Sequence, residues 1–250
     1  MLKQQKPQRQ DSEEYRKCCK FLLSRMAQRD DSQWPVARQY LIERSLDSQL
    51  IDQLYTDGQI YASKHRSNPS IVFPHRDLEG NVRGATLCTI RHQSSSTTSL
   101  GDTKNAWFNV GVELAKIHKA FVVTKSPIDA LSYQQLNAVS DPYQGCIVSV
   151  GGTHIPEALI EYTVRNDKGL IVAFDHDPSG QMGFKIAESE MRRKSQIGRG
   201  ACKAWIHCHP PPICANWNEE LQAHCSSKKK VRSSLISEQQ SQVRSRGMRL

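Results

Sequence analysis

The chain has 250 residues, of which 38% are hydrophobic and 24% are charged, enough for one large domain or two small ones with hydrophobic cores. A mean hydropathy of −0.59 and the lack of an apolar run of about 18 residues predict a soluble, cytoplasmic protein without a membrane span or secretory signal. The formal net charge is +9, to which residues 1–40 contribute +4, residues 226–250 contribute +6 and residues 41–225 contribute −1.

The first third of the chain predicts helices followed by a hairpin. Apolar residues recur at helical spacing over residues 11–29, and residues 36–56 fit two shorter helices. The alternation at 71–73, a turn at 78–81 and the apolar stretch 82–87 predict a β-hairpin. The polar stretch 93–103 is predicted to be a loop.

From residue 119 onward, strands and helices alternate. Strands are predicted at 121–124, 146–150, 170–174 and 204–206, and helices at 127–136, 155–165 and 179–194. This order predicts an α/β fold with a mainly parallel sheet and helices on both faces. Ligands bind such sheets at the carboxyl ends of the strands, so the residues that follow the strands are candidates for a site.

Two aspartates follow the strand at 170–174. Asp175 and Asp177 are spaced so that both carboxylates could hold one Mg²⁺ ion, which prefers one or two carboxylates together with water and phosphate oxygens. The same pattern also suits a helix N-cap by Asp177 or Ser179. The spacing alone leaves both interpretations open.

Two glycines follow the strand at 146–150. Gly151 and Gly152 would let a phosphate approach the backbone closely, near the start of the next helix. They would serve equally well in a tight strand-to-helix turn.

Eight cysteines without a secretory signal indicate reduced thiols. Several lie close together in the last fifth of the chain with three histidines, but without the paired spacing typical of zinc sites. We therefore favour unligated side chains for this cluster: Cys202, Cys208, Cys214, Cys225, His207, His209 and His224.

The chain ends in a basic segment, 226–250, that we predict to be disordered. Its lysines and arginine are candidates for contacts with nucleic-acid phosphates, although solvated basic tails are also common: Lys228, Lys229, Lys230 and Arg232.

Several motifs in order carry a family resemblance. The segments VVTKSPIDALSYQQL, SVGGTH and FDHDPSGQMGFKIAE resemble a Toprim domain over residues 117–222. Upstream, YLIERSLDSQLIDQLYTDGQIYA, VFPHRDLEGNVRGATL and KNAWFNVG resemble the small domain of unknown function that precedes Toprim in primase-related proteins of plasmids and mobile elements. The segment WNEEL resembles the end of that family's Toprim part.

The charge distribution and the resemblance together predict four parts: a basic N-terminal helix or arm (1–32), a small α+β domain (33–112), a Toprim domain (117–222) and the basic tail (226–250). The resemblance implies action on nucleic acid, most simply DNA, in replication or mobilisation, with proteins of those processes as partners. It also implies Mg²⁺-dependent phosphoryl or nucleotidyl transfer, with Asp175 and Asp177 as metal ligands.

The sequence departs from the family at the end of the strand at 121–124. There the family has a glutamate that serves as acid/base or metal-site carboxylate, whereas this chain has Lys125. A lysine ammonium cannot bind Mg²⁺, and we expect it to pair with Asp175 and Asp177 instead. Asp129, one helical turn further on, either points toward this site or faces solvent.

A second departure lies before Trp217, where the family's Lys-Asp pair is replaced by Ala215-Asn216. Two losses of negative charge favour a degenerate centre. Two hypotheses follow: a primase-like enzyme whose catalysis is weakened, or an inactive nucleic-acid-binding or adaptor module.

Overall fold

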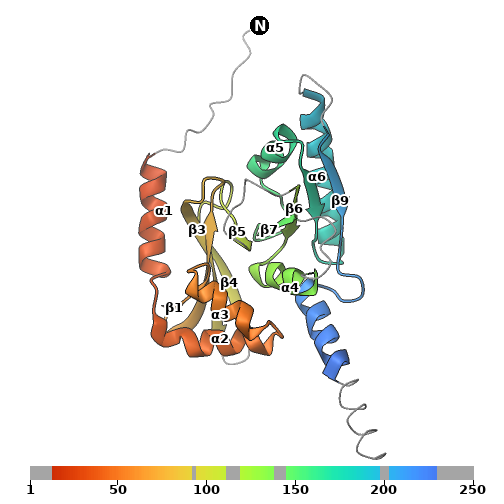
Figure 1. The fold of residues 1–250 in the computed structure, drawn as a ribbon. Coiled ribbons are helices and arrows are strands. Elements are labelled where there is room, and N and C mark those ends of the chain that lie inside the picture. The colour runs from red at the N-terminus through yellow and green to blue at the C-terminus, as the bar shows by residue number, and fades with distance from the viewer. Residues whose placement is uncertain (1–12, 92–93, 111–118, 138–144, 198–202, 230–250) are drawn as a thin grey trace, which may run out of the picture.

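The computed structural model describes residues 13–91, 94–110, 119–137, 145–197 and 203–229 (Figure 1). The predictions for residues 1–12, for Cys202 and for the end of the tail, including Lys230 and Arg232, lie outside these ranges. Among the described residues, no helix is long and apolar enough to cross a membrane.

The N-terminal unit is an antiparallel sheet with helices on both sides. Its helical elements are α1 (Glu13–Met26), the 3₁₀ turn η1 (Asp31–Gln33), α2 (Trp34–Glu43) and α3 (Ser48–Thr56). The four strands pair in chain order: β1 (Tyr61–His65), β2 (Asn68–Arg76), β3 (Val82–Arg91) and β4 (Ser94–Gly101). Asp47 begins α3 by accepting hydrogen bonds from the N–H groups of Gln49 and Leu50.

The prediction of a loop over 93–103 is wrong for Ser94–Gly101, because this segment forms β4 and pairs with β3 along its whole length. Of the side chains described in this edge strand, only that of Leu100 is buried. Serine and threonine side chains therefore face solvent, while the backbone hydrogen bonds to β3 define the strand. Hydrophobic alternation, the signal used for strands, is absent from such a segment.

The C-terminal unit contains a five-stranded sheet in the order β5-β7-β6-β8-β9. Its strands are β5 (Phe108–Val110), β6 (Ala120–Thr124), β7 (Gly145–Ser149), β8 (Gly169–Val172) and β9 (Trp205–Cys208). All neighbouring pairs are parallel except β5 with β7. The helices are α4 (Pro127–Asn137), α5 (Glu157–Arg165), α6 (Pro178–Ile197) and a last helix over 217–229.

This architecture confirms the predicted α/β fold with a smaller mixed unit before it. The two short strands β1 and β5 were not predicted. The last helix includes residues 226–229, so the prediction of disorder is wrong for these four positions. Lys228 and Lys229 lie in this helix with exposed side chains.

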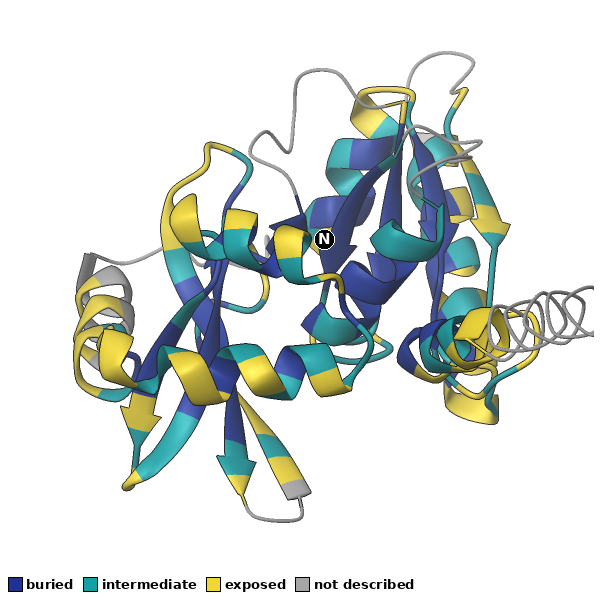
Figure 2. Ribbon diagram, turned by 60° about the horizontal axis from the view of Figure 1, so that its bottom comes forward, coloured by how far each residue is buried: buried dark blue, intermediate teal, exposed yellow. Residues whose placement is uncertain are grey.

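Helices cover both faces of the second sheet, as the buried strands in Figure 2 show. Along β6, Val122 packs in the cluster that includes α4 and the last helix, whereas Phe121 and Val123 pack in the cluster that includes α5 and α6. The strands β6, β7 and β8 are therefore buried on both sides, which explains their nearly continuous apolar sequences.

One hydrophobic cluster joins the two units. It contains Leu41 and Ile51 from the helices of the N-terminal unit as well as Leu131 and Trp217 from the C-terminal unit. A backbone bridge between Arg76 and Trp107 adds a polar connection between the sheets. The N-terminal unit thus packs directly on the α4 side of the second sheet.

Candidate functional site at the carboxyl ends of β6 and β8

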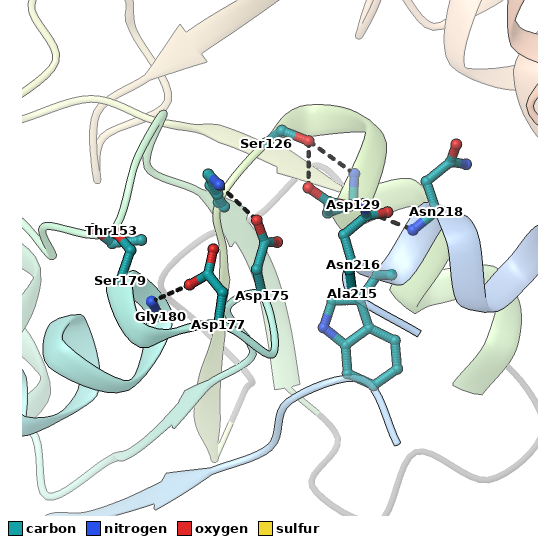
Figure 3. Close-up of polar contacts among 12 residues, drawn as sticks. Ser126, Asp129, Thr153, Asp175, Asp177, Ser179, Gly180, Ala215, Asn216 and Asn218 are labelled. Atoms are coloured by element: carbon teal, nitrogen blue, oxygen red, sulfur yellow. Dashed lines mark hydrogen bonds and ion pairs between the residues drawn. The ribbon is translucent and has the colours of Figure 1, made fainter. Parts of the chain in front are cut away.

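The predicted site residues follow three adjacent parallel strands. Lys125 follows β6, Gly151 follows β7, and Asp175 and Asp177 follow β8. Since parallel strands end on the same edge of a sheet, these residues approach one another although they are up to about fifty positions apart in sequence. Figure 3 shows Asp175 and Asp177 side by side at this edge.

Lys125 forms an ion pair with Asp175. The distance from Nζ to Oδ2 is 2.5 Å, and the two side chains are 40% and 14% exposed. The hydrogen bond to Asp175 and the nearby carboxylates raise the pKa of Lys125 above its ordinary value, so the amine is charged at neutral pH. The expected pairing is therefore present with Asp175.

The other carboxylate oxygen of Asp175, Oδ1, is buried and has no hydrogen-bond partner among the described residues. A buried carboxylate oxygen without a donor is energetically costly. The ion pair therefore provides a donor for only one of the two oxygens of this carboxylate.

Asp177 begins helix α6. Its Oδ1 accepts a hydrogen bond of 2.6 Å from the backbone N–H of Gly180, and its carbonyl accepts another from Gln181, which together make it the N-cap. Gly180 permits this arrangement, because a Cβ there would lie 2.2 Å from the carbonyl oxygen of Asp175. Of the two roles left open by the sequence, the capping role is thus visible in the geometry.

Asp129 lies in the first turn of α4 and is only 7% exposed, so it does not face solvent. Its Oδ2 accepts a hydrogen bond of 2.5 Å from the hydroxyl of Ser126, which in turn accepts the N–H of Asp129. Its Oδ1 accepts the N–H of Asn218 at 3.3 Å (Figure 3). Burial, with a further contribution from the charge of Asp175, raises the pKa of Asp129 to about 6.

The glycine turn after β7 is open to solvent. Gly151 has a φ of +73° and is exposed, and no atom lies within 4 Å of a Cβ placed on Gly152. The next residue, Thr153, contacts Ser179 at the start of α6 through their hydroxyl groups, 3.2 Å apart. The turn and the start of α6 therefore lie beside each other, with free space at Gly152.

The second departure from the family pattern has a structural role. The side-chain oxygen of Asn216 accepts the N–H of Glu219 and caps the last helix, a task that asparagine performs as well as aspartate. The carbonyl of Ala215 accepts the N–H of His176, which ties this segment to the aspartate loop. The change at Asn216 thus removes a charge while keeping the cap.

Two neighbours of the site were not identified from the sequence. Trp217 is 3% exposed and donates its indole N–H to the carbonyl of Ala173 at 2.9 Å. Asn218 is 5% exposed and donates to Ser132 in α4 and to the carbonyl of Arg44 in the N-terminal unit. The WNEEL motif marked these positions, but nothing in it revealed which distant groups they contact.

Comparison with family models identifies both units. A model described as Toprim-like matches residues 122–221, at the sheet whose edge carries Lys125, Asp175 and Asp177. The C-terminal unit is a Toprim-like domain. A model described as a protein of unknown function (DUF3991) matches residues 39–115. Together, the two domains fit a Toprim protein of the primase-related type. The comparison with curated proteins gave no match.

Solved structures of primases share this fold. The primase fragment of the bacteriophage T7 primase-helicase is 21% identical, with a TM-score of 0.50 over 76% of this chain and 71% of that one. The DnaG catalytic core is 16% identical, with a TM-score of 0.55 over 84% and 76%. The DnaG primase catalytic domain bound to ssDNA is 13% identical, with a TM-score of 0.52 over the same shares.

The Toprim-like domain raises the question of whether the residues present fit Mg²⁺. Asp175 and Asp177 supply carboxylates, but Lys125 Nζ bonds to the first and the N–H of Gly180 to the second. Within the described ranges, no three His, Cys, Asp or Glu side chains are grouped closely enough to hold a metal ion. Because an ammonium group already pairs with Asp175 and Asp177 caps α6, the donor set as folded does not fit a magnesium centre. Among the described members of the Cys/His cluster, likewise, no three side chains are grouped closely enough to hold a zinc ion.

Proposed function

We propose that this protein binds nucleic acid, DNA in the first instance, as a primase-related protein in replication or in mobilisation of a plasmid or other mobile element. The observation that carries the proposal is the joint presence of a DUF3991 domain and a Toprim-like domain in one chain whose fold is shared with primase catalytic cores. One of those cores is described as bound to ssDNA. In this proposal, the partners of the present protein would include other replication or mobilisation proteins in the cytoplasm.

Charge supports a role in binding. The body of the chain, 41–225, carries −1, whereas the two ends carry +4 and +6. Two lysines of the basic C-terminal segment, Lys228 and Lys229, lie in the last helix and have exposed side chains. Basic groups of this kind bind phosphates by releasing condensed counterions. We propose the turn of Gly151 and Gly152, with its exposed Gly151 and the open space at Gly152, as the place for a phosphate beside the site.

The ion pair favours binding over catalysis. Lys125 stands where the family pattern has a carboxylate, and its ammonium neutralises Asp175. In this proposal Asp175, Asp177 and Asp129 shape the site, and Lys125 balances part of their charge.

A second candidate function is Mg²⁺-dependent phosphoryl or nucleotidyl transfer through Asp175 and Asp177. One observation favours it: the buried Oδ1 of Asp175 lacks a partner among the described residues. Primer synthesis or nicking by the wild-type protein, abolished by Asp175→Asn, would establish this second function in place of the first.

The test of the proposal is binding of single-stranded DNA, measured by fluorescence anisotropy across a salt series on the full chain. We expect the logarithm of the association constant to fall linearly with the logarithm of the salt concentration. Each phosphate contact should contribute about −0.7 to the slope of this line. A parallel series with RNA of the same sequence distinguishes the two nucleic acids. No detectable binding to either at low salt would refute the proposal.

A charge variant of the tail locates the contact. Replacing Lys228, Lys229, Lys230 and Arg232 with glutamine is expected to reduce the salt slope by up to about 3. The matched control replaces four exposed basic residues on α5 and α6 with glutamine: Arg165, Lys185, Arg192 and Arg193. An equal loss of slope in both variants would show that the tail has no specific role.

A further inference from the structure

We propose that Lys125 is the resident cation of this site: its ammonium takes the place of a divalent metal, and the wild-type protein therefore does not bind Mg²⁺ there. This inference concerns the site used in the proposed function but does not depend on nucleic-acid binding. It rests on the finding that the residues present do not fit Mg²⁺, the metal that a Toprim-like domain implies.

The ammonium already lies where a metal ion would bind Asp175. Lys125 Nζ lies 2.5 Å from Oδ2 of Asp175. A Mg²⁺ ion bound to the same oxygen would lie about 2.1 Å from it, so ion and ammonium would compete for one place and repel each other. Binding of the metal to Oδ2 therefore requires Lys125 to leave its partner.

The surroundings of Lys125 are negatively charged. The carboxylates of Asp175, Asp177 and Asp129 all act on Lys125 and favour its charged form. Asp175 is 14% exposed at its side chain and Asp129 is 7% exposed, so solvent screens their charges poorly. The electrostatics therefore favour a positive group at this place, and Lys125 supplies it.

Other donors already engage most of the nearby aspartate oxygens. One oxygen of Asp177 is already held by the N–H of Gly180, and both oxygens of Asp129 are held by Ser126 and Asn218. Oδ1 of Asp175 is a buried aspartate oxygen without a partner among the described residues. Because Oδ2 of the same carboxylate is held by the ammonium, this is a poor ligand set for an ion that prefers octahedral geometry.

The inference predicts that removal of the ammonium creates a metal site. In a Lys125→Gln variant the carboxylates lose their counter-charge, and a divalent cation becomes the group that restores it. We expect about 5 °C of stabilisation by Mg²⁺ at about 100 times its Kd in this variant. The wild type and the control Lys185→Gln, an exposed lysine of α6, should show none beyond the general salt effect.

The experiment is thermal unfolding of the full chain without nucleic acid, in Mg²⁺ and in Na⁺ at matched ionic strength. A double variant, Lys125→Gln with Asp175→Asn, should lose the Mg²⁺ response if the gained site is this one. If Lys125→Gln does not fold without metal, recovery of folding on addition of Mg²⁺ supports the proposal, and Lys125→Arg provides a folded variant that should behave as the wild type.

Two outcomes would overturn the proposal. One is a Mg²⁺ response in the wild type that Asp175→Asn abolishes, because the metal would then bind with Lys125 in place. The other is a Lys125→Gln variant that folds and shows no Mg²⁺ response. Either result leaves the nucleic-acid proposal intact, since that proposal is decided by anisotropy rather than by metal binding.

Discussion

Single residues determine how closely helix α6 packs against the loops that follow β7 and β8. Gly180 lies where α6 begins, and the carbonyl of Asp175 is so close that no side chain fits between them. Gly183, one turn later, has the same relation to the carbonyl of Thr153, which a Cβ would approach to 2.4 Å. These glycines let the helix pack against both site loops.

Gly180→Ala is therefore expected to destabilise the protein by about 2 kcal/mol, because overpacking against a backbone atom forces the helix start to shift. The measurement is urea unfolding. Gly152→Ala is the matched control, since no atom lies within 4 Å of the added methyl group, and its free energy of unfolding should stay within about 0.5 kcal/mol of the wild type. Similar losses in both variants would contradict the close approach.

A second residue-scale prediction concerns His75, which is 3% exposed and shares a hydrogen bond of 2.8 Å with the hydroxyl of Thr86. Burial lowers its pKa from 6.5 to about 4, opposed by the charge of Asp102. Between these values the unfolded chain binds more protons than the folded one, so the stability from His75 is complete above about pH 6.5 and is lost as the pH falls.

We expect the wild type to lose about 2 kcal/mol relative to His75→Gln when the pH is lowered from about 7.5 to about 5. Urea unfolding at the two pH values measures this difference. His65→Gln, in the neighbouring strand β1, serves as the control. A difference between wild type and His75→Gln that does not vary with pH would show that the imidazole titrates normally.

At the scale of elements, a polar connection holds the N-terminal unit against α4 and the last helix. The side chain of Asn218 donates to the carbonyl of Arg44 and to Ser132, both at 3.0 Å. Gln135 of α4 accepts the N–H of Asp47 and donates to the carbonyl of Ser45. Because the N–H of Asn218 also bonds to Asp129, the same residue touches the site and the domain contact.

Asn218→Ala should cost about 2 kcal/mol, since it leaves buried polar groups without partners. It should also increase hydrogen exchange at residues 44–47, where the two units meet. Asn166→Ala, an exposed residue at the end of α5 that bonds within its own helix, is expected to change neither quantity. Unchanged exchange at 44–47 in Asn218→Ala would show that hydrophobic packing alone holds the units together.

The elements that the sequence predicted are those with a local signal. β6, β7 and β8 are short apolar runs buried on both faces, and α4 begins with proline at its first turn. The convergence of Lys125 with Asp175 followed from parallel strands ending at one edge. β4 lacked such a signal because its serines and threonines face solvent, and its pairing depends on β3.

The contacts of Asp129 and Asn218 could not be predicted for a different reason. Asn218 bonds to groups 86, 89 and 174 positions away, and no periodicity or motif encodes such a distance. The capping role of Asn216 is local, by contrast, and its sequence pattern of Asn followed three residues later by Glu is a known helix-start signal.

At the scale of the whole molecule, a charge-balanced body carries a site with its own ammonium, and basic residues are concentrated at the chain ends. Phosphate binding by the ends needs no metal, because it depends on counterion release. The site needs no metal for its folding either, because Lys125 neutralises Asp175. Both parts of the account therefore predict independence from divalent cations.

The most direct measurement compares the affinity of the full chain for single-stranded DNA in EDTA and in Mg²⁺ at matched ionic strength. The account predicts binding in EDTA at least as tight as in Mg²⁺. The Asp175→Asn variant should likewise bind at least as tightly in EDTA as in Mg²⁺. Binding that is lost in EDTA, restored by Mg²⁺ and abolished by Asp175→Asn would contradict it.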